Sequence, residues 1–259
     1  MLPRPDGGHE TILAALIKGM DEMDQVLGNL DAGNVLDVAT GNGGFIELLI
    51  SNLRSYKTIT GVDSQSNHAS GFAENFVKHP EVRFVTMDAS DLQFPDHTFD
   101  TVSISNSLHH LPDMTNVLNE MIRVLKPGGN FILQEMFRDQ QSNAQMTHVL
   151  LHHWWAQIDS ALGITHFETF TQQEILAILD GLRLKPLSWI EICDFSEDPL
   201  NPETIQFLDG IIDRYTNRAE SIPLAGPILE QGKLLREQLH RIGFQNASAI
   251  LAVGQKPMI

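Results

Sequence analysis

Short apolar runs that alternate with helical segments are the sequence feature that most restricts how this chain can fold. Between residues 34 and 137 we find five such runs, at 34–39, 58–63, 82–88, 99–105 and 130–136. Helical patterns separate most of them. Strands that alternate with helices form a parallel sheet covered on both faces. The pattern therefore predicts an α/β fold with an open, doubly wound sheet, which binds ligands at the carboxyl ends of its strands.

On either side of this region the pattern is mainly helical. Apolar residues spaced by three or four predict one amphipathic helix from Ile12 to Leu30. After residue 137 we expect helices over 142–162, 175–182, 202–220 and 227–242, and strands over 184–193 and 248–254. No internal repeat or low-complexity linker divides the chain, so we predict one domain whose second half covers the sheet.

The composition excludes several classes of protein. The chain has 33 acidic and 17 basic residues and a formal net charge of -16, which disfavours nucleic acid and anionic membranes as partners. Its single cysteine, Cys193, cannot form an intramolecular disulfide. No apolar run approaches the roughly 20 residues that span a bilayer. Charged residues from Lys18 to Asp24 interrupt any signal peptide. We therefore expect a cytoplasmic protein.

The strongest functional signal lies at residues 35–44. The first predicted strand carries Asp37 near its end, and a turn with Gly41, Gly43 and Gly44 then opens a helix. Glycines let a backbone approach a ligand closely, and the first turn of a helix offers unpaired N–H groups. This stretch therefore predicts a ligand-binding turn, with a simple tight connection as the alternative.

Two more acidic residues end the next strands. Asp63 follows Gly43 by about 20 residues, where a carboxylate accepts hydrogen bonds from ribose hydroxyls. Asp88 ends the third strand, where it would be within reach of an adenine amino group. Together with Asp37, these residues favour a cofactor that contains a nucleoside.

The details of the turn distinguish between cofactors. A dinucleotide fingerprint needs glycine or alanine at position 46, which is isoleucine here. The carboxylate of Asp37 would also repel a pyrophosphate. A cofactor with an amino-acid tail and a positive sulfonium tolerates both features, so a nicotinamide oxidoreductase is the weaker alternative.

Three motifs resemble the cofactor-binding motifs of class I S-adenosylmethionine-dependent methyltransferases. They are VLDVATGNGG at 35–44, GVD at 61–63 and MDA at 87–89. The branch that methylates small molecules, which includes the ubiquinone and menaquinone biosynthesis enzymes, is the most similar. The resemblance implies that the first motif holds the methionine part, the second the ribose and the third the adenine. The cofactor-binding residues that it implies are Asp37, Ala39, Thr40, Gly41, Gly43, Asp63, Ser64, Asp88, Ala89 and Asn106.

Two further stretches extend the resemblance, which covers residues 33–137 well and 171–193 and the last strand weakly. Residues 99–111 look like the fourth motif, and VLKPGG at 124–129 looks like the turn after the following helix. The family's sheet has seven strands, of which the last is antiparallel. Ala39 departs from the pattern, because the family more often has glycine there, and should narrow the space beside the methionine tail.

The cofactor determines what a catalytic residue must do. Methyl transfer from a sulfonium is an in-line displacement, so the protein mainly aligns the reactants and excludes water. A general base is needed only if the acceptor arrives protonated. His109 and His110 follow the fourth strand, where the resemblance places the methyl group, and are our candidates for such a base. The alternative is a hydrogen bond to a loop carbonyl.

A cluster of histidines and tryptophans lies at residues 148–155. His148 and His152 share a helix face at a spacing used by metal ligands, and His166 or Glu168 would complete a metal site if the chain folded back. The alternatives are a lining for the acceptor or a helix whose tryptophans pack on the sheet. We assign as acceptor-lining residues Met20, His148, His152 and Trp155, and we assign no metal ligand.

These observations predict a methyltransferase that uses S-adenosylmethionine to methylate a small organic acceptor, as a monomer or homodimer. The predicted single domain of residues 1–259 has an N-terminal helical cover at 1–32, a cofactor-binding core at 33–137, a helical acceptor cover at 138–181 and 194–246, and closing strands at 182–193 and 247–256. A regulatory protein that binds the cofactor without transferring a methyl group is the main alternative. A metal-dependent methyltransferase that uses the histidine cluster is another.

Overall fold

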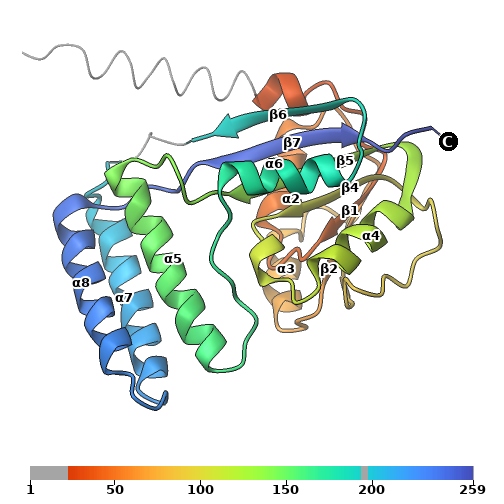
Figure 1. Ribbon diagram of the computed structural model, residues 1–259. Helices are drawn as coiled ribbons and strands as arrows, with labels where there is room; N and C mark the ends of the chain where they lie inside the picture. Colours follow the sequence, from red (N-terminus) through yellow and green to blue (C-terminus); the bar gives the residue numbers. More distant parts are fainter. Residues whose placement is uncertain (1–22, 194–197, 259) are drawn as a thin grey trace, which may run out of the picture. The chain divides into compact units, whose positions relative to one another are not determined.

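The computed structural model describes residues 23–193 and 198–258 (Figure 1). These residues form two compact units. The sheet unit comprises, among the described residues, 23–135, 174–191 and 250–258. The helical unit comprises 136–173, 192–193 and 198–249.

The sheet unit contains all or nearly all of each strand. Its elements are β1 (Asn34–Val38), α2 (Gly44–Asn52), β2 (Thr58–Asp63), α3 (His68–Asn75), β3 (Val82–Thr86), β4 (Phe99–Ser105), the short 3-10 helix η1 (Leu108–His110), α4 (Met114–Val124), β5 (Leu125–Met136), α6 (Gln172–Gly181), β6 (Leu187–Ile192) and β7 (Ala249–Gln255). The predicted alternation of strands and helices is confirmed.

The strands form one seven-stranded sheet in the order β3-β2-β1-β4-β5-β7-β6. Strands β1 to β5 pair in parallel. Strand β7 is antiparallel to β6, because Lys185 N donates to Gln255 O at 2.8 Å and Gln255 N donates to Pro186 O at 3.1 Å. Their arrows point in opposite directions in Figure 1. The mostly parallel sheet with an antiparallel last strand is therefore confirmed.

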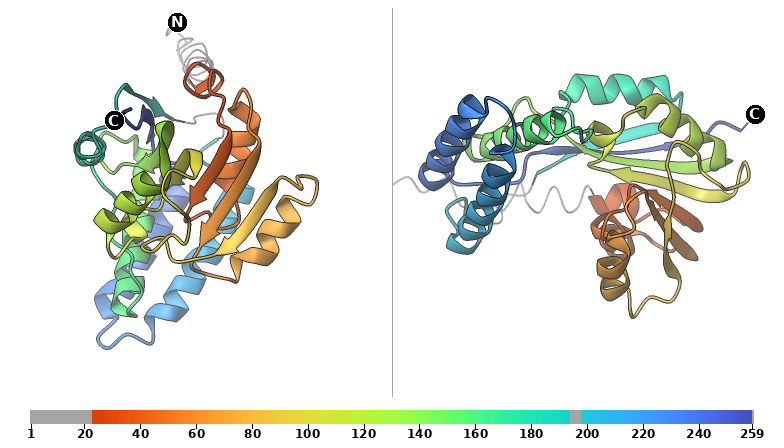
Figure 2. Two further views of the ribbon diagram at one scale, coloured as in Figure 1. Left: turned by 90° about the vertical axis from the view of Figure 1, so that its right-hand side faces the viewer. Right: turned by 90° about the horizontal axis from the view of Figure 1, so that it is seen from below.

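Helices cover both faces of this sheet. In Figure 2, α2 and α3 lie on one face, whereas α4 and α6 lie on the other. Strands in the middle of such a sheet are apolar along their whole length because neither face meets water. Six side chains of β1 and β5 illustrate this, with no exposed surface: Val35, Leu36, Val38, Phe131, Ile132 and Leu133.

Two strand boundaries differ from the sequence prediction. Strand β5 begins at Leu125 rather than at Asn130, because Leu125 already pairs with Phe99 before the chain bulges. Strand β6 begins at Leu187, after Pro186, whose nitrogen cannot donate to a neighbouring strand. Of the predicted N-terminal helix, residues 23–27 are helical, and Met20 lies outside the described residues.

The helical unit is built from α5 (Asn143–Ala161), α7 (Pro202–Ala219) and α8 (Gly226–Ile242). A capping box starts α5, in which Ser142 and Gln145 each accept a hydrogen bond from the other's backbone N–H. Trp154 is fully buried among apolar residues of α7 and α8, such as Leu208 and Leu235. Trp154 therefore belongs to the core of the helical unit.

None of the helices in the described part of the chain is both long and apolar enough to span a bilayer. The longest, α5, has 19 residues and includes three histidines and Asp159.

Close packing of α8 on Trp154 leads to a first prediction. A Cβ atom at Gly232 would lie 2.5 Å from the Trp154 ring, so Gly232→Ala should overpack this core and lower the free energy of unfolding by about 1–3 kcal/mol. Urea denaturation followed by tryptophan fluorescence measures this change. Gly210→Ala on the exposed face of α7 is the matched control, because a Cβ atom there meets nothing within 4 Å. It should stabilise the helix by about 0.5–1 kcal/mol. Equal effects of both substitutions would contradict this packing.

Candidate functional site

The turn after β1 has a backbone that side chains rarely adopt. Ala39, Gly41 and Gly43 have φ angles of 54°, 53° and 90°. A Cβ atom at Gly43 would lie 2.3 Å from the Phe76 ring, so this position requires glycine. Cβ atoms at Gly41 or Gly44 would meet nothing within 4 Å. The turn is therefore packed against α3 at Gly43 and open at its other two glycines.

Asp37 lies buried beside this turn, with 1% of its surface exposed. Ser103 Oγ donates a hydrogen bond to Asp37 Oδ1 at 2.7 Å. Burial raises the pKa of the Asp37 carboxyl to about 6, the hydroxyls of Thr40 and Ser103 lower it, and the charge of Asp63 raises it further. A cation placed nearby would favour the ionised form of this carboxyl.

Asp63 joins the ends of the first two strands. Gly41 N donates to Asp63 Oδ2 at 3.0 Å, and Gln65 N donates to Asp63 Oδ1 at 2.9 Å. Each carboxylate oxygen accepts one backbone hydrogen bond and keeps a second lone pair for another donor. Ser64, which follows Asp63, is exposed.

Asp88 holds the loop after β3. Its Oδ1 atom accepts hydrogen bonds from Ser90 N and Ser90 Oγ, each at 2.8 Å. These bonds hold the pKa of Asp88 below its usual value. Ala89, between the two residues, is half-buried. Asn106, in the loop after β4, has a φ of 43°, and its backbone N–H donates to Gln134 O at 2.8 Å.

The strand order explains why these residues come together. The chain runs outward from β1 through β2 to β3 and returns to place β4 on the other side of β1. The carboxyl ends of four adjacent parallel strands therefore carry Asp37, Asp63, Asp88 and Asn106 along one edge. The reversal of strand order at β1 and β4 is where open α/β sheets bind ligands.

A buried histidine and glutamate extend this edge toward β5. His109 Nδ1 lies 2.7 Å from Glu135 Oε1, and both side chains are buried. Glu135 Oε2 accepts hydrogen bonds from Ser107 N and Leu108 N, at 3.1 and 3.0 Å. The carboxylate accepts from the ring Nδ1–H, which orients His109. His110 is exposed, and its ring centroid lies 4.4 Å from that of His109.

Glu135 was not among the predicted site residues. The available signal was a single acidic residue near the end of a mainly apolar strand, NFILQEM at 130–136. A carboxylate in such a strand needs partners when buried.

The predicted acceptor-lining residues that the structure describes all lie on α5 in the helical unit. His148 Nδ1 accepts a hydrogen bond from Ala247 N at 3.0 Å, and its ring packs on Phe244. The ring centroid of His152 lies 6.0 Å from that of Trp155. Their role toward an acceptor stays a prediction, as does that of Met20.

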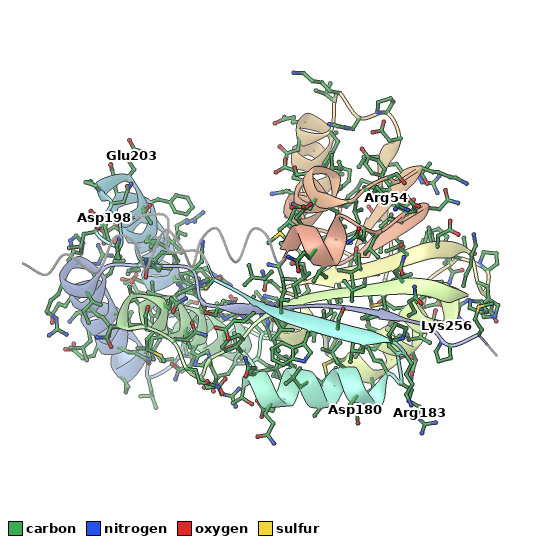
Figure 3. The ribbon with its side chains drawn as sticks, turned by 90° about the horizontal axis from the view of Figure 1, so that it is seen from above. Arg54, Asp180, Arg183, Asp198, Glu203 and Lys256 are labelled. Carbon is green, nitrogen blue, oxygen red and sulfur yellow. The ribbon has the colours of Figure 1, made fainter. Side chains whose placement is uncertain are left out.

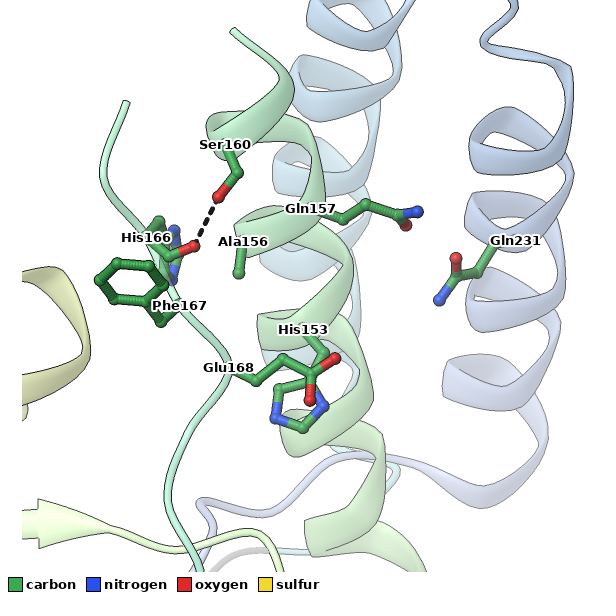
Figure 4. Close-up of a pocket in the computed structure, with 8 residues that line it drawn as sticks. All are labelled: His153, Ala156, Gln157, Ser160, His166, Phe167, Glu168 and Gln231. Carbon is green, nitrogen blue, oxygen red and sulfur yellow. Dashed lines mark hydrogen bonds between the residues drawn. The ribbon is translucent and has the colours of Figure 1, made fainter. Parts of the chain in front are cut away.

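A cavity of about 480 Å³ opens between α5, α8 and the segment that follows α5 (Figure 4). Its polar lining includes His153, Gln157, Ser160, His166, Glu168 and Gln231. Ser160 Oγ donates to the backbone oxygen of His166 at 2.8 Å, which fixes the returning segment against α5.

Comparison with known families agrees with this geometry. Residues 36–133 match the profile of a family described as a methyltransferase domain. They include the end of β1, the glycine turn that follows it, and β2 to β4. Over these residues the chain is similar to a methyltransferase domain, and its predicted resemblance to the methyltransferases is confirmed.

Curated relatives are similar to part of the chain. A demethylmenaquinone methyltransferase from Bacillus licheniformis is 32% identical over 118 residues, which are 46% of this chain and 51% of that protein. A ubiquinone/menaquinone biosynthesis C-methyltransferase from Geobacter sulfurreducens is 33% identical over 108 residues, 40% of this chain and 42% of that protein. The similarity therefore spans about half the length of these relatives or less.

Solved structures show the same fold across more of the chain. The YcgJ protein of Bacillus subtilis aligns with a TM-score of 0.57 at 19% identity, over 93% of this chain and 99% of that one. A Haemonchus contortus phosphoethanolamine N-methyltransferase, solved with S-adenosyl-L-methionine, aligns with a TM-score of 0.54 at 18% identity, over 97% of this chain and 53% of that one.

Proposed function

We propose that this protein is a methyltransferase that transfers a methyl group from S-adenosylmethionine to a small organic acceptor. The observation that carries the proposal is the edge of the sheet at the ends of β1 to β4, where an open glycine turn faces three strand-terminal acids. The similarity of residues 36–133 to a methyltransferase domain supports it.

The residues present fit this cofactor. The space at Gly41 and Gly44, which Cβ atoms would fill, leaves the backbone accessible to the methionine part. The second lone pairs on the Asp63 carboxylate suit ribose hydroxyls, and Asp88 suits the adenine amino group. The buried Asp37 carboxyl gains from a nearby positive charge. The proposed binding loops also contain Thr40, Ser64, Ala89 and Asn106.

When bound, the cofactor supplies an electrophilic methyl group on a positive sulfur. The protein then has to orient the acceptor, exclude water and accept a proton if the acceptor carries one. Glu135 holds His109 with Nδ1–H toward its carboxylate, which leaves Nε2 as the atom that can take up a proton. We propose His109 for this role, with the exposed His110 as the second candidate.

The acidic composition supports a small neutral or cationic acceptor over a polyanion such as nucleic acid. We further propose that the protein works in the cytoplasm, as a monomer or homodimer, without binding a membrane.

Isothermal titration calorimetry tests the cofactor site. We expect micromolar binding of S-adenosylmethionine and S-adenosylhomocysteine and none of NAD. Asp63→Ala should weaken binding at least tenfold, about 1.4 kcal/mol, because the ribose loses its acceptor. Asp180→Ala is the matched control, since this acid lies exposed on α6 (Figure 3). It should bind as the wild type does.

Other outcomes would change the assignment. Binding of NAD alone would overturn the methyltransferase proposal in favour of an oxidoreductase. Binding of S-adenosylmethionine without product from any acceptor in a mass-spectrometric screen would instead favour a regulatory cofactor-binding protein.

A further inference from the structure

We propose that the helical unit binds a divalent transition-metal ion through His152 and His166, with Asp159 as the residue that positions His166. No argument for this metal site depends on methyl transfer.

The two imidazoles are brought together by the return of the chain after α5. His152 lies on α5, and His166 follows the end of that helix. Their ring centroids are 4.7 Å apart with the planes at 81°, and a ring nitrogen of each lies within 4.8 Å of the other. Two nitrogens on one tetrahedral ion are roughly 3.4 Å apart with bonds of about 2.1 Å, so a small rotation of either ring would suffice.

Asp159 supplies the feature that distinguishes a metal ligand from an ordinary packed histidine. Its Oδ2 atom lies 2.7 Å from His166 Nδ1, and both side chains are buried. Because Nδ1–H donates to this carboxylate, the lone pair of the ring lies on Nε2. Histidines that bind metals are commonly oriented in this way, by a carboxylate that accepts from the other ring nitrogen.

Asp159 is itself held firmly. Arg218 lies 2.5 Å from Asp159 Oδ1, and the hydroxyl of Tyr215 donates to Oδ2 at 3.2 Å. Burial and the charge of Asp159 raise the pKa of Tyr215, so the hydroxyl remains a donor. The Arg218 charge balances that of the Asp159 carboxylate.

The neighbouring histidines of α5 have other roles. His148 Nδ1 accepts from Ala247 N, and His153 Nε2 lies 2.9 Å from Thr169 Oγ1. The metal site is thus formed from His152 and His166 rather than from the pair at 148 and 152 that helical spacing suggested.

Ligand chemistry and access indicate the class of ion. Imidazole favours zinc, cobalt, nickel and copper over magnesium or calcium, which prefer oxygen ligands. His166 also lines the cavity of the helical unit, beside Ser160 and the carboxylate-bearing Glu168 (Figure 4). The cavity provides room for water to occupy the remaining coordination positions, as in open metal sites.

The test is metal binding by the full chain without cofactor. We expect equilibrium dialysis against Co²⁺ and Zn²⁺ to show one ion per chain with micromolar affinity, and the Co²⁺ form to show visible absorption. His152→Gln and His166→Gln should each weaken binding at least tenfold, and Asp159→Asn by about 10–100-fold. His148→Gln, one turn earlier on the same helix, is the matched control and should bind normally.

The circular dichroism spectrum of each variant shows whether it folds. If a histidine variant does not fold, X-ray absorption of the zinc-loaded wild type decides, because two imidazole ligands give a characteristic scattering pattern. No binding by the wild type, no imidazole scattering, or normal binding by folded His152 and His166 variants would overturn the proposal. Binding of S-adenosylmethionine is measured in a separate calorimetric experiment. Failure of the metal-site proposal can therefore be distinguished from failure of the proposed cofactor site.

Discussion

Gly43→Ala is expected to lower the free energy of unfolding by about 2–5 kcal/mol. The residue has a φ of 90°, where a Cβ atom costs roughly 1–2 kcal/mol. That atom would also lie 2.3 Å from the Phe76 ring, and overpacking adds about 1–3 kcal/mol. Because Phe76 packs on Phe72 and lies at the end of α3, the substitution should displace this helix from the turn. Urea denaturation of the variant measures the loss.

Gly44→Ala is the matched control for this prediction. Gly44 begins α2, and a Cβ atom there meets nothing within 4 Å, so the fold should be unaffected. The added methyl group would nevertheless enter the space proposed for the cofactor, and binding of S-adenosylmethionine should weaken. If Gly43→Ala were as stable as the wild type, the packing of the turn against α3 would be wrong. If Gly44→Ala bound the cofactor normally, the proposed position of the methionine part would be wrong.

Asp37→Asn is expected to stabilise the protein without cofactor by up to about 3 kcal/mol above pH 7. The pKa of Asp37 is about 6 in the folded protein and 3.8 in a model peptide, so ionisation is disfavoured by folding. Between these two values the folded state binds more protons than the unfolded state. Stability therefore falls as pH rises from about 4 to 6 and stays reduced above that range. Asparagine has no charge to bury, yet its oxygen can still accept from Ser103.

Denaturation of wild type and variant at about pH 5 and about pH 8 measures this difference, which should be larger at the higher pH. Asp180→Asn on exposed α6 controls for the general effect of removing a negative charge and should show little change at either pH. We also expect Asp37→Asn to bind S-adenosylmethionine more weakly, because the positive sulfonium loses a nearby carboxylate. Equal stability of wild type and Asp37→Asn at both pH values would show that Asp37 is not buried as a charge.

The two substitutions concern neighbouring parts of the proposed cofactor site. The buried carboxylate of Asp37 reduces stability when no positive charge lies nearby, and Ala39 in the turn has a φ of 54°, which side chains rarely adopt. Strained backbone and shifted pKa values are typical of functional sites, where the surrounding structure holds them in place.

Local pattern was sufficient to predict most of the sheet unit. The apolar runs that became β1 to β5 are continuous because a parallel sheet is covered on both faces, and glycine or proline marks several of their ends. The turn at 41–44 was recognised because a tight connection between strand and helix requires glycine. The sequence pattern did not predict where β5 begins. Leu125 belongs to this strand because it pairs with Phe99 of β4.

Some residues of the candidate site were predicted from the sequence and others were not. Asp37, Asp63 and Asp88 were predicted together because the carboxyl ends of parallel strands share one edge. Glu135 was not, because its partner His109 is 26 residues away, and a single acid in an apolar strand does not indicate what it will meet. His166 was only one of two residues that might complete a histidine cluster, and its pairing with Asp159 had no signal in the spacing.

The sequence by itself determined the class of fold, the glycine turn after the first strand and the acids at the strand ends, because these depend on local periodicity and on the residue types that a tight turn allows. Only the tertiary structure decided the order of the closing strands, the orientation of His109 by Glu135, and the meeting of His152, His166 and Asp159. Those features depend on which side chains long-range packing brings into contact. Hydrogen bonds between residues far apart in the chain produce no periodic pattern in the sequence.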